Sequence, residues 1–377
     1  MTGYVGGVAR DPQPKLPIID ALRGVAIAGV ILVHADDWFP QLAWPLARLT
    51  AQGGWGVQLF FVLSAVTLLM SWHARKDAVA TPPFLIRRFF RVAPMFYGAI
   101  VLYALLDGVA PRAYAPAGVG PWDFLATALF LHGWLPTTIN SIVPGGWSIA
   151  AEWTFYLLFP LLAQTLTTVR RCLAALAVAL PLGAGLTYAV WHASGFGLPD
   201  RGAYLVKGYL LWWFPTQLPV FLLGFLAYHL LVGRHGRALA WAGGLAALGL
   251  AFVPLRSAAY LPYALASVLL VVGLMRAPSR WVANPALVHL GKVSYSAYFL
   301  HFLVIRYTGP LAAALTPWDS AGFVAYYGAA VVLTTLAATL TYHWIELPGI
   351  ALGRRLAASW PYSARSSSEA RASAQGT

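Results

Sequence analysis

The chain has 377 residues, of which 59% are hydrophobic and only 10% are charged, and its formal net charge is +13. This composition excludes an ordinary water-soluble domain, in which about a quarter of the residues are charged. It indicates a membrane protein with several spans, because a chain in hydrocarbon must satisfy its backbone hydrogen bonds within helices. The positive charge therefore predicts basic cytoplasmic loops rather than binding to nucleic acid.

Long apolar stretches predict an all-α polytopic membrane bundle of about ten transmembrane helices. The expected spans cover residues 17–36, 55–72, 92–108, 147–168, 172–191, 208–231, 238–254, 258–275, 286–308 and 321–343. Residues 123–146 are apolar but interrupted by Pro136 and Pro144, so we expect a re-entrant or interfacial segment. The expected organisation is a cytoplasmic segment at 1–16, a membrane domain at 17–350, and a basic, disordered cytoplasmic tail at 351–377.

Basic residues alternate between the loops in a way that predicts the orientation. The loops placed in the cytoplasm hold Arg75, Lys76, Arg87, Arg88, Arg91, Arg170, Arg171, Arg234, Arg237, Arg276, Arg280, Arg354 and Arg355. The opposite loops hold fewer basic residues, namely Arg48, Arg112, Arg201, Lys207 and Arg256. By the positive-inside rule, we expect a multi-pass protein of the cell membrane with both termini in the cytoplasm.

The first expected span carries three ionisable side chains, Asp20, Arg23 and His34. The step from Arg23 to His34 returns to within roughly 20° of the same helix face, and Asp20 lies about 40° from His34. Ionisable groups inside a membrane mark functional sites. A neutral imidazole suits a general base, so His34 is a candidate catalytic residue, with a buried, carbonyl-bonded histidine as the alternative.

Two further spans each carry a polar stripe. Ser148, Glu152 and Tyr156 share one face, where the carboxylate could orient His34 or form a packing pair. Ser294, Tyr298 and His301 share a face of a later span, and they line a substrate cavity or hold helices together.

Three arginines, Arg87, Arg88 and Arg91, precede Pro94 at the cytoplasmic start of a span. Guanidinium groups at a helix start suit phosphate, although a cytoplasmic anchor is the alternative. Gln58 is expected to support close helix packing. The stretch 343–348 is expected to end the last helix, and no paired-histidine spacing in the sequence suggests a metal.

In this order, the motifs resemble the acyltransferase 3 family of integral-membrane acyltransferases. The resemblance rests on Asp20–Gly24 with His34, Phe60–Ser64, Arg87–Pro94, Trp147–Ser148 with Glu152–Tyr156, Ser294–Ser296 with His301, and Glu346–Pro348. The arginine–histidine motif of the family matches Arg23 and His34, and its paired-arginine motif matches Arg88 and Arg91.

The resemblance implies an enzyme that moves an acyl group, most often acetyl from acetyl-CoA, to a hydroxyl of a carbohydrate or envelope glycoconjugate, without a metal. A macrolide or other secondary metabolite is the alternative acceptor, and a transporter or flippase of a lipid-linked sugar or drug is the alternative of another class. With the residue patterns above, we predict His34, Glu152 and Asp20 as catalytic residues and Arg88, Arg91, Arg87 and Arg23 as the residues that bind coenzyme A. The predicted acceptor-binding residues are Trp147, Ser148, Tyr156, Ser294, Tyr298 and His301.

Overall fold

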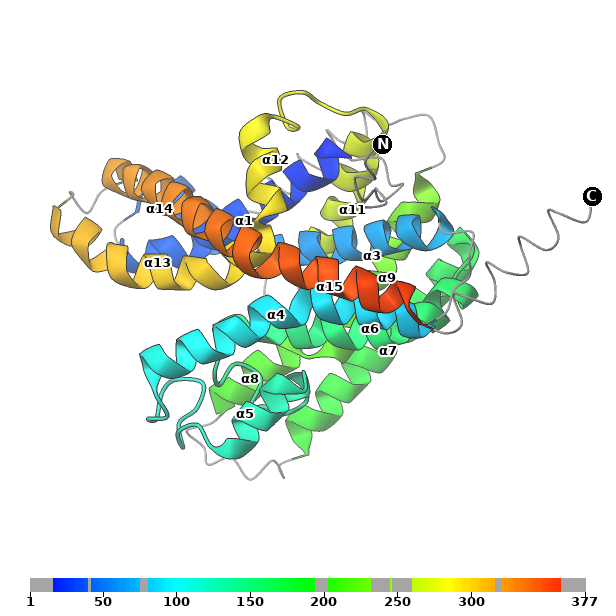
Figure 1. Ribbon diagram of the computed structural model, residues 1–377, viewed down its shortest axis with the longest axis horizontal. Helices are drawn as coiled ribbons and strands as arrows, with labels where there is room; N and C mark the ends of the chain where they lie inside the picture. Colours follow the sequence, from blue (N-terminus) through cyan, green and yellow to red (C-terminus); the bar gives the residue numbers. More distant parts are fainter. Residues whose placement is uncertain are drawn as a thin grey trace, which may run out of the picture.

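The computed structural model describes residues 16–39, 42–74, 81–193, 203–231, 245, 260–315 and 320–360. These residues form an all-helical bundle without a β-strand (Figure 1). Seven helices among them are long and apolar enough to cross a membrane. They are Pro17–Trp38, Trp44–Ala74, Thr81–Asp107, Val169–His192, Tyr204–Leu230, Ser294–Leu315 and Ser320–Ala358. The predicted all-α membrane class is confirmed, whereas the predicted number of about ten spans is not.

The bundle is built from helices of very different length. They are α1 (Pro17–Ala35), α2 (Trp44–Ala51), α3 (Gly56–Ala74), α4 (Thr81–Asp107), α5 (Pro121–Ala128), α6 (Trp147–Thr165), α7 (Val169–His192), α8 (Ala203–Trp212), α9 (Phe214–Leu230), α11 (Tyr260–Arg276), α12 (Pro285–Lys292), α13 (Ser294–Leu315), α14 (Ser320–Thr341) and α15 (Leu347–Ala358).

Several expected spans differ from these helices. The expected span 286–308 was wrong as a single helix, because α12 ends at Lys292 and α13 begins at Ser294. The expected span 258–275 corresponds to α11, which has 17 residues and is shorter than the seven candidate spans. Helix α6 replaces the expected span 147–168, but it is not among the seven.

Some expectations fall on residues that the structure does not describe. They concern the span 238–254 (apart from Leu245), the tail beyond residue 360, the segment before residue 16, and the loop residues Arg75, Lys76, Arg201, Arg234, Arg237 and Arg256.

The segment 123–146 contains the larger part of the short helix α5 and one further helical turn. After α5 comes a single turn at His132–Trp134, and the chain then enters α6 through Gly145. Gly145 has a φ of +74°, which an L-residue with a side chain rarely adopts. No helix in this segment is long enough to cross a membrane, and its re-entrant or interfacial placement stays a prediction.

The C-terminal helix continues where the sequence predicted an end. A π-helical turn at Tyr342–Glu346 joins α14 to α15, which packs along α4 (Figure 1). Pro348 is tolerated because it lies at the start of α15, where a backbone N–H has no helical partner. The prediction that 343–348 ends the last helix was wrong, and α15 passes beyond the expected domain end at residue 350.

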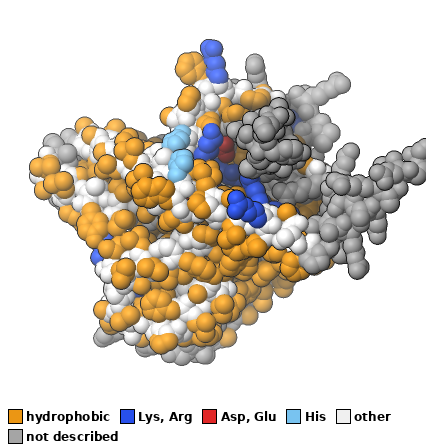
Figure 2. Space-filling model, in the orientation of Figure 1, with side chains coloured by type: hydrophobic (Ala, Val, Ile, Leu, Met, Phe, Trp, Pro, Cys, Tyr) orange, Lys and Arg blue, Asp and Glu red, His pale blue; other side chains and the backbone are white. Residues whose placement is uncertain are grey.

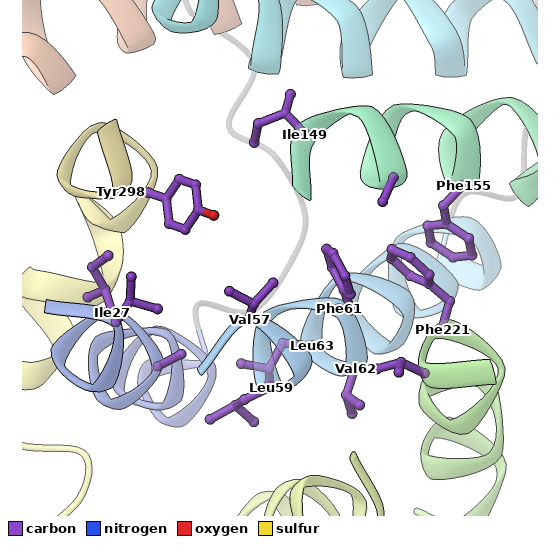
Figure 3. Packing of buried hydrophobic residues seen from close by; sticks show 14 of the residues in the cluster. Ile27, Val57, Leu59, Phe61, Val62, Leu63, Ile149, Phe155, Phe221 and Tyr298 are labelled. Atoms are coloured by element: carbon purple, nitrogen blue, oxygen red, sulfur yellow. The ribbon is translucent and has the colours of Figure 1, made fainter. Parts of the chain in front are cut away.

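Apolar side chains fill the interior and also cover much of the outside. In the core, Phe155 of α6 stacks on Phe221 of α9 with ring centroids 4.1 Å apart (Figure 3). Helix α7 exposes Leu173, Val178 and Leu182, as expected for a surface in contact with lipid. Hydrophobic side chains cover most of the face in Figure 2, and many of its visible basic side chains gather in the upper part.

Helices α1 and α12 pack with their backbones in close contact. A Cβ atom on Gly24 would collide with the carbonyl group of Leu287, and one on Gly291 would collide with the carbonyl group of Asp20. Both positions therefore require glycine, and this contact fixes the end of α1 that carries Asp20 and Arg23.

We predict that Gly291→Ala destabilises the protein by about 1–3 kcal/mol, the usual cost of forcing atoms into a packed interface. Gly328→Ala on α14 is the matched control, because a Cβ there meets no atom within 4 Å. Thermal unfolding of both variants in detergent tests this expectation. An unfolding midpoint of Gly291→Ala equal to that of the control would contradict the close contact.

Candidate active site

The bundle contains two neighbouring cavities with different linings. The larger, about 710 Å³, is named here the histidine cavity and is lined by residues that include His34, Gln58, Asn140, Trp147 and Trp212. The smaller, about 110 Å³, is named the arginine cavity and is lined by residues that include Arg23, Ser64, Arg88, Arg91 and Glu152. The candidate residues thus divide between two spaces.

His34, in the last turn of α1, faces the histidine cavity. Its ring lies against Phe302, with centroids 4.5 Å apart, and against His301, with centroids 5.3 Å apart. His301 is fully buried, and its Nδ1 is 3.2 Å from the carbonyl oxygen of Ala297. Within the described part of the chain, no hydrogen bond holds the His34 ring, so both of its nitrogens remain able to meet a ligand.

The arginine cavity brings together three of the four predicted phosphate-binding residues. Arg23 approaches Thr67 (Nη2 to Oγ1, 3.4 Å) and Asp20 (Nη1 to Oδ1, 3.8 Å). The Arg88 guanidinium carbon lies 6.0 Å from the centre of the Tyr156 ring, and Arg91 also lines the cavity. Arg87 precedes this group on α4 but is not part of the cavity lining.

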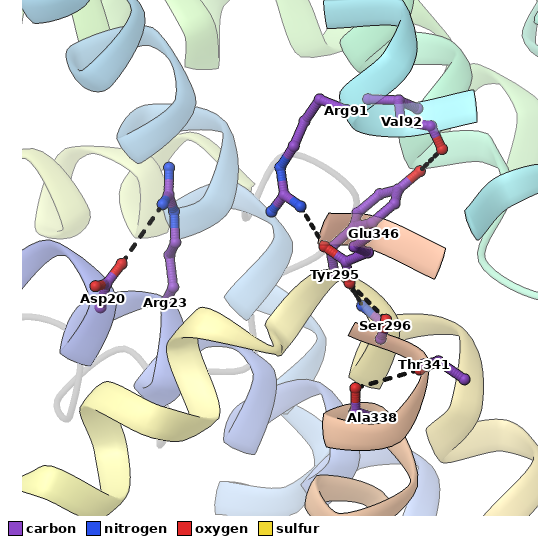
Figure 4. A network of polar contacts seen from close by, with 9 residues as sticks. All are labelled: Asp20, Arg23, Arg91, Val92, Tyr295, Ser296, Ala338, Thr341 and Glu346. Atoms are coloured by element: carbon purple, nitrogen blue, oxygen red, sulfur yellow. Dashed lines mark hydrogen bonds and ion pairs between the residues drawn. The ribbon is translucent and has the colours of Figure 1, made fainter. Parts of the chain in front are cut away.

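Arg91 is held in place by a buried carboxylate. Glu346, whose side chain is 0% exposed, forms an ion pair with Arg91 and accepts hydrogen bonds from the backbone N–H and the hydroxyl of Ser296 (Figure 4). The Arg91 guanidinium also lies 5.4 Å from the centre of the Tyr295 ring. Sequence reasoning missed Glu346, because the motif at 343–348 was taken for a helix end.

Glu152 lies on the arginine side rather than beside His34. Its Oε1 accepts hydrogen bonds from Ser64 Oγ at 2.7 Å and from Tyr156 Oη at 2.5 Å. Among the described residues, no hydrogen bond or ion pair joins Glu152 to His34. The geometry therefore does not place this carboxylate where it could orient the imidazole, and His301 occupies the neighbouring position instead.

Asp20 is likewise far from His34. The two residues are fourteen positions apart on α1, which corresponds to about 21 Å of helix rise. In this structure Asp20 neighbours Arg23, so its contribution is to the charge of the arginine group rather than to His34.

The two cavities meet at Tyr298 of α13 and Val57 of α3, which line both. The Tyr298 hydroxyl donates to the carbonyl oxygen of Gly145 and accepts from Ser148, each at 3.0 Å. Figure 3 shows this hydroxyl pointing into the space between Val57 and Ile149 of α6. A Cβ on Gly145 would lie 2.9 Å from the Tyr298 oxygen, so glycine permits this contact. We call this point the junction.

The remaining predicted acceptor-binding residues divide between the cavities. Ser294 and Tyr156 line the arginine cavity, as does Ser148. Trp147 lines the histidine cavity and stacks on Trp212, with centroids 5.6 Å apart and 12° between the ring planes. The described residues contain no group of three or more His, Cys, Asp or Glu side chains that could hold a metal ion.

Comparisons with known proteins identify relatives that share most of this chain. It is 28% identical to the acyltransferase MdmB of Streptomyces mycarofaciens, over 90% of this chain and 93% of that protein. It is 25% identical to a putative O-acetyltransferase of Staphylococcus aureus strain COL, over 88% of this chain. The O-acetyltransferase OatA of Staphylococcus aureus strain NCTC 8325 is 26% identical over 88% of this chain. The alignment spans only 57% of the length of each staphylococcal protein.

No solved structure matches this chain. The acyltransferase domain that defines the acyltransferase 3 family matches residues 16–343, which include both cavities. On this match and on the names of its relatives, the chain belongs to the acyltransferase 3 family of membrane acyltransferases.

Proposed function

We propose that this protein transfers an acetyl group from acetyl-CoA to a hydroxyl of a carbohydrate or envelope glycoconjugate. The observation that carries the proposal is the pair of cavities that meet at Tyr298, one lined by arginines and one by His34. The donor is a thioester with negatively charged phosphates, which suits the arginine cavity. The acceptor carries hydroxyl groups, which suits the histidine cavity. A transporter or flippase has no evident need for the arginine group.

The arginine cavity is the proposed entry for the donor. Guanidinium groups bind phosphate through paired N–H donors, and Arg23, Arg88 and Arg91 face this one space. Its volume of about 110 Å³ admits only a slender part of acetyl-CoA. We therefore assign the pantetheine end to the cavity and the nucleotide to the region beside Arg87 on α4, which this proposal places on the cytoplasmic side.

His34 is the proposed general base. Its imidazole takes the proton of the acceptor hydroxyl while the hydroxyl oxygen forms a bond to the acetyl carbonyl carbon. The C–S bond then breaks, and the coenzyme A thiolate leaves and takes up a proton. The product is an O-acetyl ester, and no external oxidant or metal is required. His301, packed against His34, is a positioning residue in this scheme.

Glu152 and Asp20 act on the donor side in this proposal. Glu152, held by Ser64 and Tyr156, places a negative charge in the arginine cavity, and Asp20 does the same beside Arg23. These carboxylates set the spacing of the guanidinium groups and limit their mutual repulsion.

A macrolide or other secondary metabolite is the second acceptor class. The histidine cavity has a volume of about 710 Å³, within the range of about 300–1,000 Å³ typical of sites for drug-sized ligands. It would therefore admit a sugar-bearing small molecule as well as the end of a glycan.

Replacing His34 by alanine is expected to lower coenzyme A release by a factor of about 10²–10⁴, because a positioned base is lost. Turnover is measured on purified protein with acetyl-CoA and a panel of glycan and small-molecule acceptors, and donor affinity is measured by calorimetry. Donor affinity should remain at the wild-type value. His343→Ala, at an exposed histidine, is the control, and wild-type turnover in the His34 variant would rule out the base.

Glu346→Gln is expected to raise the KM for acetyl-CoA by about ten- to a hundredfold, because the charged hydrogen bond that holds Arg91 is weakened. The turnover number should change less, since Glu346 lines neither cavity. Arg171→Ala removes an exposed guanidinium that donates hydrogen bonds to Thr165 and Thr167 and lines neither cavity, and it serves as control. A larger effect on the turnover number than on KM would contradict a positioning role.

Tyr298→Ala is expected to open the junction and to increase hydrolysis of acetyl-CoA several-fold when no acceptor is present. Tyr298→Phe keeps the ring but loses both hydrogen bonds, so it should give an intermediate rate. The assay is release of coenzyme A into acceptor-free buffer. Hydrolysis at the wild-type rate in both variants would show that Tyr298 does not separate the two substrates.

A further inference from the structure

Four side chains surround the junction of the two cavities. They are Val57 and Phe61 of α3, Ile149 of α6 and Tyr298 of α13, and all four line the arginine cavity. Figure 3 shows Val57 and Ile149 on opposite sides of the space into which the Tyr298 hydroxyl points. Val57 and Tyr298 also line the histidine cavity. We call these four side chains the frame.

The frame offers a hydrocarbon surface. Val57, Phe61 and Ile149 carry no polar side-chain atom, and the Tyr298 hydroxyl is already engaged with Gly145 and Ser148. Such a surface favours contact with an alkyl group, because burial of apolar surface is favourable and no free polar group there seeks a partner.

The proposed reaction brings the acyl group of the donor to this point. The pantetheine end is assigned to the arginine cavity and the acceptor to the histidine cavity, so the carbonyl carbon must react where the two cavities meet. The alkyl part of the acyl group is bonded to that carbon and therefore lies against the frame. Little room remains for it, because the volume of about 110 Å³ must also hold the pantetheine end.

The position of Val57 is fixed by its two neighbours in the chain. A Cβ atom on Gly56 would lie 2.2 Å from the carbonyl oxygen of Ala26, so this end of α3 packs directly on α1. On the other side, Gln58 Nε2 donates to Oε1 of Gln217 of α9 at 3.2 Å, and both glutamines are buried. Gln58 thereby serves the helix packing expected from the sequence. A valine in a helix also has one preferred rotamer, so its methyl groups stay in place.

The opposite sides of the frame are equally constrained. Phe61 stacks on Phe221 with ring centroids 4.4 Å apart and meets the Trp147 ring edge-on at 6.2 Å. Tyr298 is tied to Gly145 through its hydroxyl. Close-packed interiors yield little to added volume, so a frame of this kind selects ligands by size. In a hydrophobic pocket, one methylene changes specificity by about 10- to 200-fold.

We propose that the frame holds the alkyl part of the donor's acyl group and that Val57 limits this group to two or three carbons. The inference rests on the proposed function and adds the residue that sets its acyl length. Acetyl and propionyl groups fit the frame, whereas a butyryl group meets the methyl groups of Val57.

The test is binding of acetyl-CoA, propionyl-CoA and butyryl-CoA to purified full-length protein without acceptor, measured by calorimetry. Wild-type protein should bind butyryl-CoA at least about tenfold more weakly than acetyl-CoA. Val57→Ala should reduce this ratio to about threefold or less, because rigid neighbours cannot fill the space that two methyl groups leave. Val57→Ile adds one carbon and should weaken binding of propionyl-CoA about tenfold as well.

Val66→Ala is the matched control, because it removes the same two methyl groups from a buried position of α3 that lines neither cavity. It should keep the wild-type ratio of affinities. Should Val57→Ala fail to fold, Val57→Ile decides. Equal affinity of the wild type for all three donors, or wild-type ratios in a folded Val57 variant, would overturn the proposed role of Val57.

The same measurement separates this inference from the proposed function. Length-dependent binding that responds to Val57, combined with absent acetyl transfer, would overturn the proposed reaction and leave the acyl site standing. Acetyl transfer with affinities indifferent to Val57 would overturn the acyl site alone. Binding of no acyl-CoA would overturn the proposed donor and this inference together.

Discussion

The lack of water in a bilayer is the constraint on which this structure depends. A polar side chain in hydrocarbon must find its partner inside the protein, so such groups gather in the interior. Helix α7 carries apolar residues toward the outside, whereas Arg91, Glu346 and Ser296 meet within the bundle. The close contact of α1 with α12 belongs to the same pattern, since it lets the Asp20–Arg23 end of α1 approach the start of α13. The arginine cavity follows from these packed, mutually satisfied groups.

The sequence predicted well those features that depend on a single helix. Helical periodicity correctly placed polar side chains on inward faces, as the cavity linings show for Arg23, His34 and Tyr298. It did not predict that Arg23 and His34 serve different cavities. The two residues share a face but are about 16 Å apart along the axis, and a face gives a direction rather than a depth. The same limit applies to Glu152: periodicity gave the face that it shares with Ser148 and Tyr156, but not its depth, and it lies among the arginines.

Features that depend on distant partners could not be read from the sequence. Arg91 and Glu346 are 255 positions apart, and Gln58 and Gln217 are 159 apart, so no local pattern links either pair. Glu346 was also hidden by Pro348, which usually ends a helix but here begins α15 after a π-helical turn. The break between α12 and α13 at Val293 has no proline or glycine at the break itself, and Gly291 just before it serves the contact with α1. Tertiary packing decided these points.

The segment 123–146 connects the acceptor side with the junction. Asn140 and Ser141 border the histidine cavity, and Gly145, a few residues later, accepts the hydrogen bond from Tyr298. Arg112 donates a hydrogen bond to the carbonyl oxygen of Ser141, so part of the lining of the histidine cavity and the Tyr298 contact are built on one short stretch of backbone. A thioester that reached the histidine cavity without an acceptor would meet water there and be lost by hydrolysis. One segment thus carries residues of the histidine cavity and the carbonyl group that binds Tyr298. Binding of an acceptor in this cavity can therefore affect access through the junction. The segment 123–146, with its irregular backbone, is thus the part of the fold best placed to favour acyl transfer over hydrolysis of the thioester.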